Sequence, residues 1–206
     1  MEHDTLPLRL SSSRVIPNVH LIGIGSNWSE AAQPVTIECS NNNNEARIQI
    51  FAAGSTDSGI PSSWFATSTR SGLVGLPPLI SQAAVEQALD VLKRQLAVPP
   101  QSSSSSSSSV VVVVRVLSIH WGPNWADASS TDSQRFRQLL AHQLIDQGLV
   151  DVIHGHSSHH IRGIELYKGK CILYGTGDLI NDYEGFRNRG EEIYETFGGL
   201  FLLEVD

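Results

Sequence analysis

Two stretches of the sequence decide the fold: VVVVVRVLSIH at residues 110–120 and VDVIHGHSSHHIRGIE at residues 150–165. The first is a β-branched apolar run without the polar alternation of a half-exposed strand, which is typical of a central parallel strand buried on both faces. Gly122 and Pro123 follow it and end the strand. The second stretch begins with a shorter apolar run and continues into a histidine-rich loop. Each stretch therefore predicts a strand that leads into a polar loop.

Two amphipathic helices are expected beside these strands. Apolar residues recur with helical spacing over 84–96, after a possible N-cap at Ser81, and over 136–144, before a stop at Gly148. Further strands are expected at 35–39, 47–52, 164–167, 171–174 and 200–205, with hairpin turns at 41–44 and 168–170. The pattern predicts an α/β domain in which helices pack on a mixed sheet.

The length and composition suit one globular domain. The chain has 206 residues, of which 40% are hydrophobic and 17% are charged. A run of serines at 102–109 is too polar to pack and costly in entropy to order, so it is interpreted as a flexible insertion.

The charge and the apolar runs exclude some partners. A formal net charge of -7 argues against a nucleic-acid-binding surface. The same charge would repel a polyglutamate chain, so binding of such a polymer needs a local basic groove, and the sequence alone identifies none. Arg115 interrupts the longest apolar run, which is far shorter than the roughly 20 residues that cross a bilayer. No signal peptide is visible at the N-terminus, which favours the cytoplasm while the compartment stays open.

Three histidines are the candidate metal ligands: His120, His156 and His159. Imidazole is the commonest neutral metal ligand, and the carboxyl ends of neighbouring parallel strands meet at one edge of a sheet. We therefore expect these three side chains to converge in one cleft. Zinc, manganese or iron would suit them. Neutral rings leave the charge of the cation uncompensated, so at most about one metal should bind, and loosely.

Other polar and aromatic residues are weaker candidates for supporting the site or contacting a substrate. They are His154, His160, Asp178, Asn181, Asp182 and Trp121. His154 and His160 lie one or two residues from the candidate ligands, so they are expected to point elsewhere, in a supporting or solvated role. Asp178 follows a glycine-rich turn and is either a site residue or a simple turn residue. Trp121 and Trp125 could wall a pocket, although large aromatic residues more often serve as packing.

Several motifs resemble the capsule-synthesis CapA family in order and spacing. They are His120-Trp121-Gly122, Gly155-His156-Ser157-Ser158-His159, the segment 162–170, and the strand and Gly-Asp turn at 172–178. Weaker similarity at 23–27 and 58–64 extends the resemblance to residues 19–206, and residues 1–18 match nothing in the family. The resemblance implies a fold like the C-terminal part of a calcineurin-type metallophosphoesterase. In such enzymes two metal ions held by His, Asp and Asn activate a water against a phosphoester.

The first half of the family pattern is absent from the sequence. That half supplies its own Gly-Asp strand end and an Asn-His loop with a nearby Asp. Neither is found upstream of the motifs quoted above, so the chain is interpreted as a truncated member or as a gene model missing its front. The resemblance then implies a poly-γ-glutamate synthesis protein derived from a metal-dependent hydrolase, active only if the missing ligands are restored. The alternatives are a noncatalytic accessory protein of polymer synthesis or export, or an inactive fragment. The substrate, small molecule or polymer, is not readable.

Overall fold

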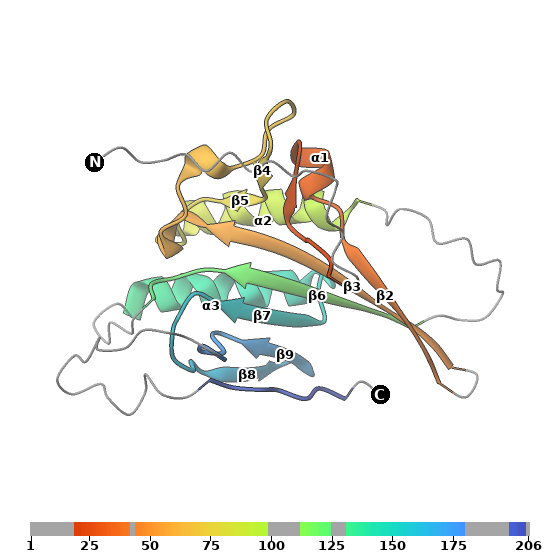
Figure 1. The fold of residues 1–206 in the computed structure, drawn as a ribbon. Coiled ribbons are helices and arrows are strands. Elements are labelled where there is room, and N and C mark those ends of the chain that lie inside the picture. The colour runs from red at the N-terminus through yellow and green to blue at the C-terminus, as the bar shows by residue number, and fades with distance from the viewer. Residues whose placement is uncertain (1–18, 42–43, 99–111, 125–130, 180–197, 205–206) are drawn as a thin grey trace.

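The computed structural model describes residues 19–41, 44–98, 112–124, 131–179 and 198–204 (Figure 1). The strands are β1 (Ile24–Gly25), β2 (Val35–Asn41), β3 (Asn44–Ser55), β4 (Gly72–Leu73), β5 (Gly75–Leu76), β6 (Val112–His120), β7 (Val152–His156), β8 (Ile164–Tyr167) and β9 (Lys170–Leu173). The helices are α1 (Trp28–Ala31), α2 (Gln82–Leu96) and α3 (Thr131–Asp146), and short 3-10 turns occupy Thr56–Ser58 and Ser62–Trp64. None of these helices is long and apolar enough to cross a membrane.

The main sheet is mixed, as expected. Its strand order is β2-β3-β6-β7-β9-β8, and β5 pairs with the end of β3. Strands β3, β6, β7 and β9 are parallel, whereas β2 and β8 are antiparallel edge strands. The β2–β3 turn and the β8–β9 turn are the two hairpins that the sequence predicts. The α/β class is confirmed, and the likeness to a calcineurin-type fold stays a prediction.

Both predicted helices pack on one face of the sheet, where α2 and α3 also contact each other (Figure 1). The core lies between them and the sheet. Four residues in register, one from each central parallel strand, form a fully buried row across it: Phe51, Leu117, Ile153 and Ile172. Side chains alternate along each strand, so the residues before and after these four point to the opposite face.

On this opposite face, one expectation about the burial of β6 is wrong in part. The mainly apolar run of β6, which lacks polar alternation, predicts burial on both faces, but Val112 is 53% exposed at the start of the strand. Val114, Val152 and Leu173 are buried without belonging to the helix-covered core. An apolar run shows that both faces of a strand carry apolar side chains. It does not show that other parts of the protein cover both faces.

The prediction of a last strand at 200–205 is wrong for the residues that the structure describes. Residues 200–204 form no strand, and Leu202 is 92% exposed. An apolar segment becomes a strand only if a sheet edge accepts its backbone, and no such pairing is present among the described residues. The serine run at 102–109 and the unmatched segment 1–18 lie outside the described residues.

The N-cap of α2 gives a first testable prediction. The Ser81 side chain accepts a hydrogen bond of 3.2 Å from the backbone N–H of Ala84. Ser81→Ala should lower the free energy of unfolding by about 1 kcal/mol, because the helix then has one more unsatisfied N–H. Urea denaturation measures the change, with Ser63→Ala as a control at an exposed serine outside the caps. Equal effects of the two changes would contradict the capping role.

Candidate functional site

The carboxyl ends of β6 and β7 bring a group of polar side chains together on the sheet face opposite the helices. His120 of β6 is in register with His156 of β7, and Ser118 is in register with His154. In both strands these residues alternate with core residues such as Ile119, so all four point away from the helices. We call His120, His154 and His156 the histidine row.

Hydrogen bonds connect the histidine row into a continuous chain. The Nδ1 atoms of His120 and His156 are 3.0 Å apart. The Ser118 hydroxyl lies 3.1 Å from Nε2 of His156 and 3.2 Å from Nδ1 of His154. At the far end, the Thr176 hydroxyl lies 3.4 Å from Nε2 of His154. Both ring nitrogens of His156 are therefore positioned by neighbours on the adjacent strand β6.

Burial holds the histidine row in its neutral form. It lowers the pKa of His154 and His120, and for His120 the nearby Asp57 carboxylate partly offsets the shift. The pKa of His156 falls to about 4, mainly through burial and further through the charges of His120 and His154. Neutral imidazole is the protonation state that binds a metal ion.

The distance between the two Nδ1 atoms also fits a shared cation. Two nitrogens that each lie about 2.0–2.1 Å from one ion are about 3.0–3.4 Å apart, depending on the coordination angle. The observed separation of 3.0 Å is at the short end of this range. The pair can therefore either share a proton or face one metal ion without rearrangement of the strands.

His159, the third candidate ligand, lies outside the row. Its Nδ1 is 2.6 Å from Oδ2 of Asp178, and its backbone N–H donates to the carbonyl of Asn124 at 3.0 Å. The pKa of His120 is lowered in part by its electrostatic interaction with His159, so the two rings lie at the same edge. A carboxylate on one ring nitrogen is the usual partner of a metal-binding histidine. Even so, the described part of the chain contains no group of three His, Cys, Asp or Glu side chains arranged to hold a metal.

The structure places the weaker candidate site residues in different surroundings. His154 belongs to the row, contrary to the expectation that it points elsewhere, because residues two apart on a strand share a face. His160 is buried rather than solvated. Trp121 is 2% exposed and stacks on Tyr174, so it is a core residue rather than a pocket wall. Asn181, Asp182 and Trp125 lie outside the described residues.

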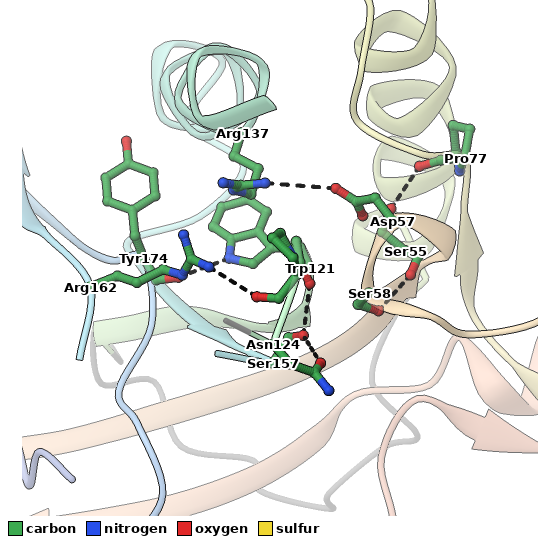
Figure 2. A network of polar contacts seen from close by, with 12 residues as sticks. Ser55, Asp57, Ser58, Pro77, Trp121, Asn124, Arg137, Ser157, Arg162 and Tyr174 are labelled. Atoms are coloured by element: carbon green, nitrogen blue, oxygen red, sulfur yellow. Dashed lines mark hydrogen bonds and ion pairs between the residues drawn. The ribbon is translucent and has the colours of Figure 1, made fainter. Parts of the chain in front are cut away.

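The residues that follow the histidines fasten the two loops to each other (Figure 2). The Ser157 hydroxyl donates to the carbonyl of Gly122 at 2.7 Å, and Arg162 donates to the carbonyl of Pro123 at 2.9 Å. The indole N–H of Trp121 donates to the carbonyl of Tyr174 at 3.1 Å. These motif residues hold the loop after β6 against the loop after β7 and against the segment after β9, and so fix the ends of the histidine row.

Two buried charged residues beside this edge were not identified from the sequence. Nη1 of Arg137, on α3, lies 3.8 Å from Oδ2 of Asp57, which follows β3 (Figure 2). Neither Asp57 oxygen nor this nitrogen has a hydrogen-bond partner among the described residues. Gly122 accommodates the guanidinium, since a Cβ there would lie 2.7 Å from Nη1. Helical spacing gives one signal for Arg137, which precedes the buried Ala141 by one turn and so belongs to the buried stripe of α3.

The sequence of the chain is similar to those of known bacterial proteins. The model of the family described as bacterial capsule synthesis protein PGA_cap matches residues 16–183. A probable polyglutamine synthesis accessory protein of Mycobacterium tuberculosis is 34% identical over 187 residues, which are 91% of this chain and 43% of that protein. The PGA biosynthesis protein CapA of Bacillus subtilis is 34% identical over 80 residues, 39% of this chain and 20% of that protein. The chain thus spans less than half the length of these relatives.

Proposed function

Because the chain belongs to the bacterial capsule synthesis PGA_cap family, we propose that it is an accessory protein of polyglutamate capsule synthesis whose histidine row binds a divalent metal ion. One observation carries the metal proposal. The Nδ1 atoms of His120 and His156 are 3.0 Å apart, and both rings are neutral at pH 7 because their pKa values are lowered. The chain spans less than half the length of the Mycobacterium tuberculosis relative, and the reaction class we propose for a site completed by further ligands is metal-dependent hydrolysis of a phosphoester.

Each residue at the edge has a definite part in this proposal. His120 and His156 would hold the ion, and Ser118 orients the ring of His156 through its Nε2. Asp178 contacts Nδ1 of His159, so that the neutral ring carries its lone pair on Nε2. A bound zinc, manganese or iron ion would supply Lewis-acid activation of water. Two nitrogen donors make a loose site, and carboxylates that would bridge a second ion are not arranged there within the described residues.

Zinc binding to purified variants tests the proposal. Titration calorimetry on the wild-type chain should show about one ion per chain, and His120→Ala or His156→Ala should weaken binding at least about tenfold, the usual scale for losing one ligand contact. His142→Ala is the matched control, since His142 contacts Glu165 on the other side of the sheet. Thermal melts would verify that the variants fold. Unchanged affinity in both row variants would refute the metal site.

Hydrolysis is tested separately with a chromogenic phosphoester. With two or three neutral ligands and no bridging carboxylate placed among the described residues, the chain should turn it over poorly or not at all, even with zinc or manganese present. Strong metal-dependent turnover would contradict this expectation and would assign the chain a complete catalytic centre.

A second candidate function, a noncatalytic role through a partner protein, is favoured by the uncovered sheet face. Ile37 on β2 and Ile164 on β8 lie at its two edges and are exposed, and Leu166 is 78% exposed. Exposed apolar side chains grouped at the edge of a sheet, such as Ile164 and Leu166 on β8, are typical of a protein interface. Genetic complementation separates the two functions. A His120→Ala/His156→Ala chain should retain the accessory role, whereas Ile164→Lys/Leu166→Lys should lose it.

A further inference from the structure

A second concave site lies away from the histidine row. It is a pocket of about 450 Å³ between α1, the loop that follows the second 3-10 turn, β5 and α2. Figure 1 shows α1, β5 and α2 in the upper half of the view, whereas β6 and β7, which carry the histidine row, lie lower. The residues that matter for binding are Trp28, Ser29, Phe65, Ser68, Val91 and Arg94. The volume falls within the range of about 300–1,000 Å³ that is typical of small-molecule sites.

Two hydrogen bonds and a close aromatic contact hold the walls of this pocket in place. The backbone N–H of Trp28 donates to the carbonyl of Thr67 at 2.7 Å, and Arg70 donates to the carbonyl of Phe65 at 2.9 Å. Phe65 lies directly on Gly75, where an added Cβ would be 2.0 Å from the ring. The Phe65 ring is therefore held on Gly75, and the backbone of Trp28 is held to the loop that contains Thr67.

Arg94 places a positive charge beside the aromatic wall. The guanidinium carbon lies 5.5 Å from the centre of the Trp28 ring, and Nε donates to the carbonyl of Asp90 at 3.3 Å in the same helix. Within the described ranges, no carboxylate lies at ion-pair distance from Arg94. The pocket thus combines an oriented cation that lacks a counterion with apolar walls and hydroxyl groups.

We propose that this pocket binds a glutamyl unit of an acidic polyamide. The carboxylate would pair with the Arg94 guanidinium, the methylene groups would lie on Trp28 and Phe65, and the hydroxyls of Ser29 and Ser68 would face the amide groups. The preference for a carboxylate on an apolar stem follows from the pocket, while the choice of a polyglutamate chain rests on the proposed function. The pocket also supplies the local positive charge that a chain of net charge -7 needs to bind such a polymer.

Fluorescence anisotropy with labelled decamers tests the proposal. Arms with γ-linked glutamate, α-linked glutamate and neutral glutamine distinguish the linkage and the charge. Both glutamyl decamers should bind at least about tenfold more tightly than the glutamine decamer, and Arg94→Gln should cost about tenfold, the effect of one charge-assisted contact. Lys93→Gln is the matched control, because it makes the same charge change on the same helix outside the pocket. Arg94 is exposed, so the variant should melt like the wild type.

Several outcomes would overturn the assignment. They are the absence of binding by any decamer at millimolar concentration, equal binding of the neutral decamer, equal losses in Arg94→Gln and Lys93→Gln, or tighter binding of an acidic polysaccharide such as polygalacturonate. A His120→Ala/His156→Ala chain should bind the glutamyl decamers like the wild type. If it does, a failed metal site leaves the pocket assignment standing; if it does not, the polymer binds at the histidine row and the pocket assignment is wrong.

Discussion

An Arg137→Leu variant should lose about 3–5 kcal/mol of unfolding free energy, because the change leaves the carboxylate of Asp57 buried without a countercharge. The side chain of Arg137 is 3% exposed and that of Asp57 is 9% exposed. No hydrogen bond from the described residues compensates either Asp57 oxygen. Burial lowers the pKa of Arg137, and the nearby Asp57 carboxylate opposes that shift. Guanidinium chloride denaturation measures the loss.

A double-mutant cycle supplies the control. Arg137→Leu combined with Asp57→Leu removes both buried charges, and replacing a buried pair by apolar side chains is often neutral or stabilising. The double variant should therefore regain most of the stability that the single variant loses. If the two losses simply add, Asp57 and Arg137 are not coupled, and the 3.8 Å separation is a chance approach rather than an ion pair.

The sequence predicted the layers of this fold well because periodicity reports which side chains face the core. The β6 run, the two helical stripes and both hairpins are where local patterns place them. The last expected strand failed for a nonlocal reason. Residues 200–204 have the apolar character of a strand, but strand formation depends on a partner edge that the local pattern cannot show.

The candidate site was predictable in part. Register across parallel strands brings His120 and His156 together, and strand-end histidines indicate such a meeting. The geometry of His159 depends on a loop and on its contact with Asp178, for which the sequence offers no rule. Asp57 and Arg137 come from different elements that meet only after packing. Their proximity could not be predicted from either segment alone.

Lowering the pH should destabilise the protein through the histidine row. In the folded chain the pKa of His156 is lowered from 6.5 to about 4, so between these values the unfolded state binds more protons than the folded state. Stability then rises with pH across this window and becomes constant above it. The full contribution of His156 is on the order of 3 kcal/mol, of which about 2 kcal/mol should be lost between pH 7 and pH 5.

Urea denaturation in a chelating buffer at half-unit steps from pH 7 to pH 5 would measure this loss without interference from bound metal. The variant His156→Gln keeps a polar side chain at this position but removes the titrating group. The difference between the stability curves of wild type and variant therefore separates the effect of His156 from that of the carboxylates, which titrate at lower pH. His120 and His154, whose pKa values are also lowered by burial, should leave a smaller slope of the same sign in the variant. If stability changes with pH in the same way in wild type and variant, His156 is solvated in the folded chain. The metal proposal would then lose the buried, neutral nitrogen pair on which it rests.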